Sequence, residues 1–127
     1  MSIQSRLDAL RQTLSDCQIT AFGDVSSCLI LRSSTDGPCP REALDKLGAQ
    51  AASVAKHLDT VKAEAPAHTP LYGQAFATFN AEKTTVYART GQNEDDVVCA
   101  ALGPDSDIDA GLRAATSTIL SLQDEGA

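Results

Sequence analysis

The sequence has few aromatic side chains and no long apolar run. It contains no tryptophan and only five aromatic residues among 127, so stacking platforms for single-stranded nucleic acid are not expected. No stretch approaches the roughly 20 apolar residues of a membrane-spanning helix. The first residues predict a polar amphipathic helix rather than a signal peptide. These absences predict a cytoplasmic protein whose core is built from Leu, Ile, Val and Ala.

Basic residues are scarce in the last quarter of the chain. Residues 1–93 hold nine acidic and nine basic side chains, whereas residues 94–127 hold eight acidic side chains and only Arg113. A surface of that sign repels phosphate groups, so we expect no nucleic-acid partner and no membrane partner. A protein partner with a basic patch is compatible with this charge. The candidate contact residues for such a partner are Glu94, Asp95 and Asp96. The alternative for these three acids is a solvated turn.

Motifs that carry chemistry are also missing. None of the four cysteines forms a C-x-x-C pair, and His57 and His68 do not lie at ligand spacing from each other or from a cysteine. There is no Gly-rich phosphate loop and no nucleophile elbow. We therefore expect no metal, no cofactor and no enzymatic activity. One enzyme hypothesis stays open, in which Cys39, between Pro38 and Pro40, is a nucleophile with either histidine as its base.

Three segments have the period of an amphipathic helix. Residues 2–15 place Ile, Leu, Leu and Leu on one face, with Ser2 as the N-cap. A second helix is predicted to begin near Pro40 and to carry an apolar stripe as far as Leu58, flanked by many small residues. The stripe of a third helix runs over 108–122, capped by Asp105 or Ser106.

Five runs have strand character. The first two are separated by turn residues 23–26, and a proline-bearing connection over 59–73 follows the second helix. Cys17, Cys28 and Cys99 fall within apolar runs and are expected to be buried as small hydrophobic residues. The predicted strands are 17–22, 27–33, 74–80, 84–89 and 97–102.

The order of these elements predicts the fold class. It is α-β-β-α-β-β-β-α, an α+β arrangement in which short connections favour a five-stranded, largely antiparallel sheet flanked by helices. A chain of this length fits a single domain. We assign residues 1–123 to that domain and residues 124–127 to a polar tail.

Two segments resemble a known family. The hairpin over 19–32 and the closing segment over 102–113, in which Gly111 is followed two residues later by Arg113, are similar to the Roadblock/dynein light chain family. The resemblance covers nearly the whole chain. It implies a non-catalytic platform that binds small Ras-like GTPases or motor and signalling complexes.

The resemblance also implies a homodimer. In this family the second helices of two copies pack together, and their third strands join two sheets into one. On this sequence the dimer surface would comprise Leu44, Leu47, Ala51, Val54 and Leu58 of the second helix, with Ala75, Ala77 and Phe79 of the third strand.

A second function class fits the same size and acidity. Type III secretion chaperones are also small, acidic, dimeric α+β proteins, and they hold a partner segment in an extended form. Their usual order places three strands before the middle helix, whereas this sequence predicts two. The strand order therefore separates the two hypotheses.

Overall fold

The computed structural model describes residues 2–64, 75–79, 81–89 and 95–126. In that part of the chain the predicted α-β-β-α-β-β-β-α order is confirmed, with two strands before the middle helix rather than the three expected of the chaperone alternative. The elements are α1 (Ile3–Thr13), β1 (Cys17–Asp24), β2 (Leu29–Thr35), α2 (Arg41–Glu64), β3 (Ala75–Phe79), β4 (Thr84–Ala88), β5 (Asp96–Leu102) and α3 (Ile108–Gly126).

The five strands form one antiparallel sheet. Their order is β2-β1-β5-β4-β3, and every neighbouring pair is antiparallel. Strand β5, the last in the sequence, lies at the centre between β1 and β4. Strands β2 and β3 each pair on one side only among the described strands, so the sheet has two open edges.

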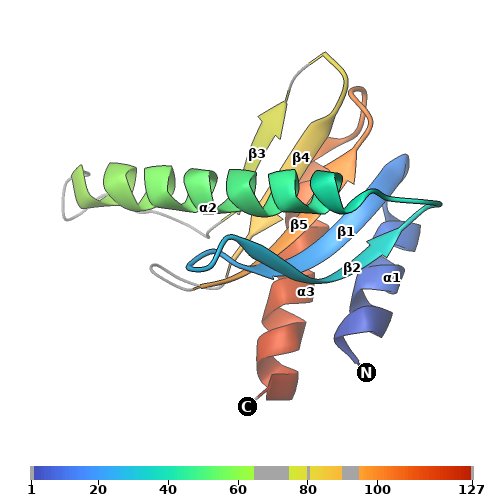
Figure 1. Ribbon diagram of the computed structural model, residues 1–127, viewed down its shortest axis with the longest axis horizontal. Coiled ribbons are helices and arrows are strands. Elements are labelled where there is room, and N and C mark those ends of the chain that lie inside the picture. The colour runs from blue at the N-terminus through green and yellow to red at the C-terminus, as the bar shows by residue number, and fades with distance from the viewer. Residues whose placement is uncertain (1, 65–74, 80, 90–94, 127) are drawn as a thin grey trace.

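The helices lie on both faces of this sheet, in three layers (Figure 1). Helices α1 and α3 cover one face, and α2 crosses the other face alone. The core between the sheet and the α1–α3 layer is aliphatic, and its buried members include Leu10, Val86, Val98, Ile119 and Leu122. None of the helices in the described part of the chain combines the length and hydrophobicity that a membrane span requires.

Helix α1 begins at the N-cap that the sequence predicts. The Ser2 hydroxyl accepts a hydrogen bond from the Ser5 amide at 3.1 Å, which satisfies one of the free donors of the first turn. Leu7 and Leu10 are buried on one side of the helix. The hydroxyl of Thr20 in β1 donates to the Leu7 carbonyl at 2.7 Å, so a polar contact also joins this helix to the sheet.

The predicted turn over 23–26 lies two residues too early, because β1 continues to Asp24 and the observed turn occupies 25–28. Gly23 is buried beside Ile30 of β2, immediately after an irregularity in the strand pairing. A Cβ at Gly23 would lie 2.8 Å from the Leu29 carbonyl oxygen. Glycine is therefore required here because the backbone of β2 comes close to β1. The sequence alone does not distinguish a glycine of this kind within a strand from a glycine in a turn.

Cys28 occupies the observed turn with a φ of 60° and is exposed, so its predicted burial is wrong. Its carbonyl lies against α2 at Gly48, where a Cβ would sit 2.5 Å from the Cys28 oxygen. Gly48 thus lets the helix approach the turn closely. The predicted burial of Cys17 and Cys99 is confirmed.

Helix α2 continues to Glu64, so the prediction that it ends near Leu58 and that residues 59–73 form a connection is wrong over 59–64. Those six residues include Lys62, Ala63 and Glu64, which are good helix formers. The described part of the helix ends at Glu64, two positions before Pro66 in the sequence. Residues 65–73 of the predicted connection lie outside the described residues.

Helix α3 begins at Ile108, but its capping residue lies one or two positions later than predicted. The carboxylate of Asp107, rather than Asp105 or Ser106, accepts a hydrogen bond from the Ala110 amide at 3.2 Å. The carboxylate of Asp109 lies in the first turn, where it complements the helix dipole. The helix runs to Gly126 and so includes residues that we assigned to a polar tail.

Candidate functional site

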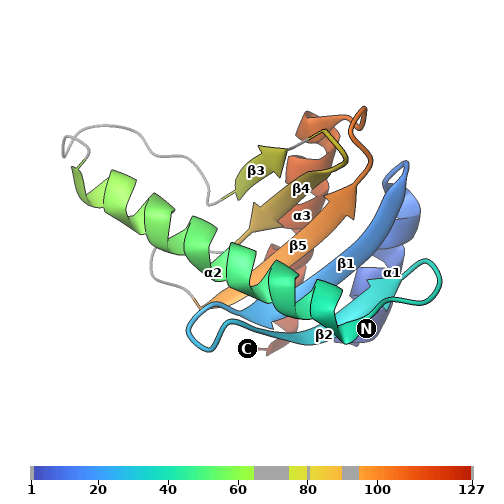
Figure 2. The same cartoon turned by 45° about the horizontal axis from the view of Figure 1, so that its top comes forward.

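Helix α2 covers only part of its face of the sheet. It packs against β2, β1 and β5, while its C-terminal half projects past the strands (Figures 1 and 2). With 24 residues it is about 36 Å long. On the neighbouring strands, α2 contacts Tyr87 of β4 and Phe76 of β3 through one cluster of buried and partly buried side chains.

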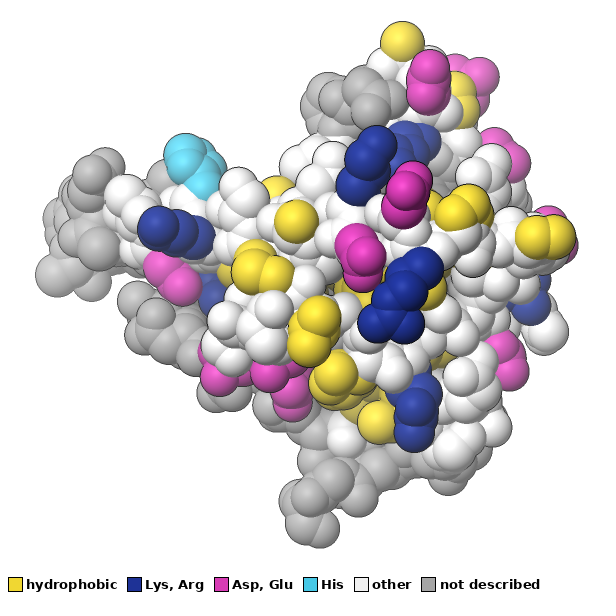
Figure 3. Space-filling view, in the orientation of Figure 1, with side chains coloured by type: hydrophobic (Ala, Val, Ile, Leu, Met, Phe, Trp, Pro, Cys, Tyr) yellow, Lys and Arg dark blue, Asp and Glu magenta, His cyan; other side chains and the backbone are white. Residues whose placement is uncertain are grey.

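Two separate hollows lie along this side of the helix, and we call the surface that contains them the α2 flank. Its helical wall is Ala43, Lys46, Gln50 and Val54, and its floor includes Phe76 and Tyr87 of β3 and β4. A pocket of about 300 Å³ opens near the start of α2, and a void of about 10 Å³ lies farther along. The space-filling view shows basic, acidic and hydrophobic side chains interspersed on the face of α2 (Figure 3). Such a mixed surface suits a protein contact better than a polyanion.

Tyr87 supplies the polar contacts in the middle of the α2 flank. Its hydroxyl lies 3.5 Å from the Gln50 side-chain oxygen and 3.4 Å from the Thr78 hydroxyl, so it bridges α2 and β3. Its ring packs with the buried Val97 and Cys99. Burial raises the pKa of the Tyr87 hydroxyl above its ordinary value. The phenol therefore stays protonated and acts as a neutral hydrogen-bonding group.

Arg89 anchors the projecting half of α2 to the sheet. Its side chain is 3% exposed, and it pairs with Asp59 through Nη2–Oδ1 and Nη1–Oδ2 distances of 2.5 and 3.4 Å. Nη2 also lies 3.5 Å from the Ala55 carbonyl oxygen. No local sequence pattern points to this pair. A lone arginine at the end of the apolar strand β4 was the available signal, but its partner lies 30 residues away.

The structure separates the predicted dimer residues into two groups. Leu47 and Ala51 are 5% and 3% exposed and pack against this chain's own sheet. Leu44 and Val54 remain partly exposed on α2. On the edge strand β3, Ala75 and Ala77 are also partly exposed, whereas the side chains of Leu58 and Phe79 are not among those described.

Two of the predicted partner-binding acids lie at one end of the sheet. Asp95 and Asp96 are exposed at the start of β5, and Asp96 pairs with Asp24 at the end of β1. The hydroxyl and amide of Ser26 hydrogen-bond the Asp24 carboxylate and lower its pKa. These acids therefore form a negatively charged end of the sheet. Glu94 lies outside the described residues.

The residues of the thiol-enzyme hypothesis are not brought together. Cys39 is half-buried just before α2, and its thiol lies 3.7 Å from the Pro40 carbonyl oxygen. His57 is exposed on α2, about 24 Å along the axis from Arg41 at the helix start. His68 lies outside the described residues. Within the described ranges, no three His, Cys, Asp or Glu side chains are grouped as metal ligands.

We expect iodoacetamide to modify Cys28 and Cys39 in the folded protein and to spare Cys17 and Cys99. Burial raises the pKa of Cys17 to about 11 and that of Cys99 to about 12, so reactive thiolate is scarce at pH 8. Peptide mass mapping before and after unfolding in urea checks this pattern. Rapid native labelling of Cys99 would contradict the described packing, and labelling of all four cysteines after unfolding is the control.

Comparisons by sequence and by structure give different results. No protein-family model matches the chain, and no curated protein matches it by sequence. Several solved structures, in contrast, match the chain by fold. A Roadblock/LC7 domain from Streptomyces avermitilis has a TM-score of 0.77 at 9% identity, covering 98% of each chain. MglC from Myxococcus xanthus has a TM-score of 0.69 at 12% identity, covering 98% of this chain and 99% of the other.

A structure of MglB with a tetrameric arrangement has a TM-score of 0.70 at 16% identity, covering 96% of this chain and 88% of the other. Similarity of this kind, at low identity but over nearly the whole length, concerns the path of the chain rather than its binding partners. It agrees with the observed helix order and the antiparallel sheet order. The chain therefore has a Roadblock-type fold.

Proposed function

We propose that this protein is a non-catalytic, dimeric platform that binds a protein partner, either a small Ras-like GTPase or a component of a signalling or motor complex. The observation that carries the proposal is the α2 flank. It is an open helix side beside an open strand edge, on a chain whose described residues hold no cluster of metal ligands. Roadblock-type fold neighbours support the same class of function.

Two features support a homodimer through α2 and β3. An antiparallel pair of β3 strands across a two-fold axis would cover the open edge of both sheets. The half of α2 that projects past its own sheet would then lie above the sheet of the second copy (Figure 2). The tetrameric arrangement of MglB is a property of that protein, and it supports self-association as a use of the fold.

The proposed dimer surface retains the residues from the sequence analysis, in two roles. Leu44 and Val54 of α2 would contact the second copy directly, and Leu58 is kept from the sequence-based prediction. Leu47 and Ala51 would support them from the core. The strand contribution is Ala75, Ala77 and Phe79 of β3.

The partner would meet the acidic end of the sheet. Asp95 and Asp96 are exposed there, and Glu94 precedes them in the sequence. Exposed acids of this kind speed association with a basic patch more than they slow dissociation, because they act over roughly 8–10 Å in physiological salt. We propose that these three residues steer the partner to the platform.

The test uses the small Ras-like GTPases of the source organism, each loaded with GDP or a GTP analogue, in surface-binding kinetics. The variant Glu94→Gln/Asp95→Asn/Asp96→Asn should lower the association rate constant about tenfold at low salt and less at physiological salt. A matched variant, Asp36→Asn/Asp45→Asn/Asp105→Asn, removes three other exposed acids and should change this rate much less.

Two outcomes would contradict the proposal. If the two triple variants associate at the same rate at every salt concentration, the acids over 94–96 belong only to a solvated turn. If the purified protein hydrolyses GTP by itself over many turnovers, it is an enzyme and not a non-catalytic platform.

A further inference from the structure

We propose that a strip at one end of the sheet binds a segment of a protein partner in which aliphatic side chains are followed by basic ones. The strip comprises Leu29 and Leu31 of β2, Asp24 at the end of β1 and Asp96 at the start of β5, and we call it the acidic-apolar strip. The inference rests on the proposed role as a protein-binding platform, and it adds the chemistry of the segment that the platform would recognise.

The strand register places three of these side chains in one row. Leu29 lies opposite Asp24 in the pairing of β2 with β1, and Asp24 lies opposite Asp96 in the pairing of β1 with β5. Side chains directly opposite each other in antiparallel strands share one face of the sheet, with Cβ atoms about 4.5–5.5 Å apart. A leucine and two carboxylates therefore follow one another across three neighbouring strands.

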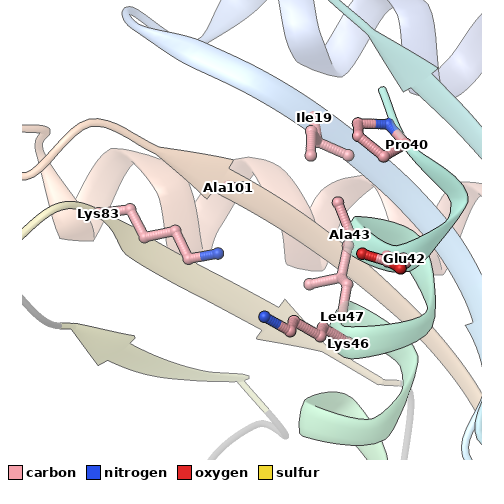
Figure 4. Close-up of a pocket in the computed structure, with 8 residues that line it drawn as sticks. All are labelled: Ile19, Pro40, Glu42, Ala43, Lys46, Leu47, Lys83 and Ala101. Atoms are coloured by element: carbon pink, nitrogen blue, oxygen red, sulfur yellow. The ribbon is translucent and has the colours of Figure 1, made fainter. Parts of the chain in front are cut away.

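The row lies on the sheet face that carries α1 and α3. Phe22 and Val98 are the next opposite pair on this face, two positions from Asp24 and Asp96, and both pack in the core beneath those helices. The pocket at the start of α2 lies on the other face, because Ile19, which lines it, packs with the side chains under α2 (Figure 4). The acidic-apolar strip is thus a surface separate from the α2 flank.

The apolar part of the strip is open to water. Leu29 and Leu31 are each 49% exposed, and β2 pairs only with β1 among the described strands. Below α2, where Figure 1 places β1 and β2, hydrophobic and acidic side chains both reach the surface (Figure 3). A partner that covers the two leucines removes apolar area from water, at about 25 cal/mol for each Å².

The strand edge favours contact through side chains over addition of a regular strand. Ile30 lies opposite Gly23 and Arg32 opposite Phe22, so Leu31 has no opposite residue in β1 and forms a bulge. A bulge interrupts the regular spacing of backbone groups that an added strand would need. The leucine side chains, rather than the backbone of β2, are therefore the expected contact.

Charge decides which occupant fits. The hydroxyl and amide of Ser26 hydrogen-bond the Asp24 carboxylate and lower its pKa, so this group stays ionised at neutral pH, and Asp96 is exposed. Arg32 of β2 lies opposite Phe22 and not opposite either acid. A second copy of this chain, with a net charge of −7, would be repelled. Basic side chains beside aliphatic ones complement the strip.

The test titrates the peptide acetyl-Leu-Ser-Leu-Ser-Lys-Ser-Lys-amide into ¹⁵N-labelled protein and follows amide chemical shifts. Alternation puts its leucines and lysines on one side of an extended chain. We expect saturable shifts at Leu29, Leu31 and Asp96, with about millimolar affinity because the charges are solvated. A peptide with glutamate in place of both lysines should give no saturable shifts at these amides.

Two variants with matched controls separate the apolar and the acidic contributions. Leu29→Ser/Leu31→Ser should raise the dissociation constant of the lysine peptide about tenfold. Leu120→Ser, which truncates a leucine that is 50% exposed on α3, should leave it unchanged.

Asp24→Asn/Asp96→Asn should raise the same dissociation constant about fivefold at low salt. Asparagine keeps an oxygen that can accept from Ser26, so the turn is retained. Asp45→Asn/Asp105→Asn removes two other exposed acids and is the matched control. Urea unfolding of each variant checks that the fold survives.

The proposal is wrong if the lysine peptide gives no saturable shifts up to tens of millimolar, if either strip variant binds it as tightly as its control, or if the glutamate peptide binds equally well. A lower mass of Leu29→Ser/Leu31→Ser in light scattering would also overturn it, because the strip would then be an interface between copies. The GTPase kinetics test the proposed function separately. Peptide binding at the strip without association of any GTPase would contradict the GTPase proposal and leave this inference standing.

Discussion

Replacing Val54 with lysine is expected to convert a dimer into a monomer of 13.3 kDa. Val54 is half-buried beside the floor of the α2 flank, where the stem of a lysine can lie along apolar surface and keep its amine in water. Packing of a second α2 against this position would remove that water, and an unpaired buried charge costs several kcal/mol. We therefore expect the dimer dissociation constant to rise about 100-fold.

Light scattering at tens of micromolar protein measures this change, with Ala49→Lys as the matched control. Ala49 is exposed on the same helix and lines neither hollow of the α2 flank, so the added charge should stay hydrated and the dimer mass should persist. Urea unfolding of both variants checks that the fold survives. An unaltered protein with the mass of one chain would exclude the dimer, and an unchanged dissociation constant for Val54→Lys would place its interface elsewhere.

The ion pair between Asp59 and Arg89 should give the second large effect. Asp59→Asn is expected to lower the free energy of unfolding by about 3 kcal/mol, because it removes the carboxylate from a guanidinium that is 3% exposed. Arg89→Met should cost less, about 1.5 kcal/mol, since the Asp59 side chain is 30% exposed and water can solvate its charge. Methionine also fills much of the space that the arginine stem occupies.

Urea titration of the two single variants and the double variant forms a cycle that isolates the coupling of the pair. Asp45→Asn removes an exposed acid from the same helix and should change stability by less than about 0.5 kcal/mol. Equal costs for Asp59→Asn and Asp45→Asn would mean that the pair contributes nothing to the anchoring of α2. If the pair also positions the projecting half of the helix, both ion-pair variants should weaken the dimer.

Much of the fold could be predicted from local patterns. The apolar period of the first helix and the hydroxyl of Ser2 are neighbours in sequence, and the structure has both the helix and its cap. The predicted strands, which turn residues bound in the sequence, end within a few residues of the observed strands. These predictions hold because helix period, capping and strand alternation depend on residues only a few positions apart.

Element ends were less predictable where tertiary contacts decide them. Glycine is common in turns, but Gly23 lies within β1, at a point where the backbone of β2 comes close to it. The last turns of α2 carry no long apolar stripe, yet Asp59 is held there by Arg89 of a distant strand. Contacts of this range cannot be derived from one segment at a time.

The sequence by itself determined the order of the elements, the α+β class and the acidic last quarter, because each follows from local period or from composition. Only the tertiary structure decided which residues of the apolar stripe of α2 are buried in the core. Leu47 and Ala51 face this chain's own sheet, while Val54 turns toward the open flank. The tertiary structure also brought Lys46 and Lys83 to the lining of one pocket. The physical reason is that a helix has a fixed period, but the width and twist of the sheet beneath it determine where its coverage ends.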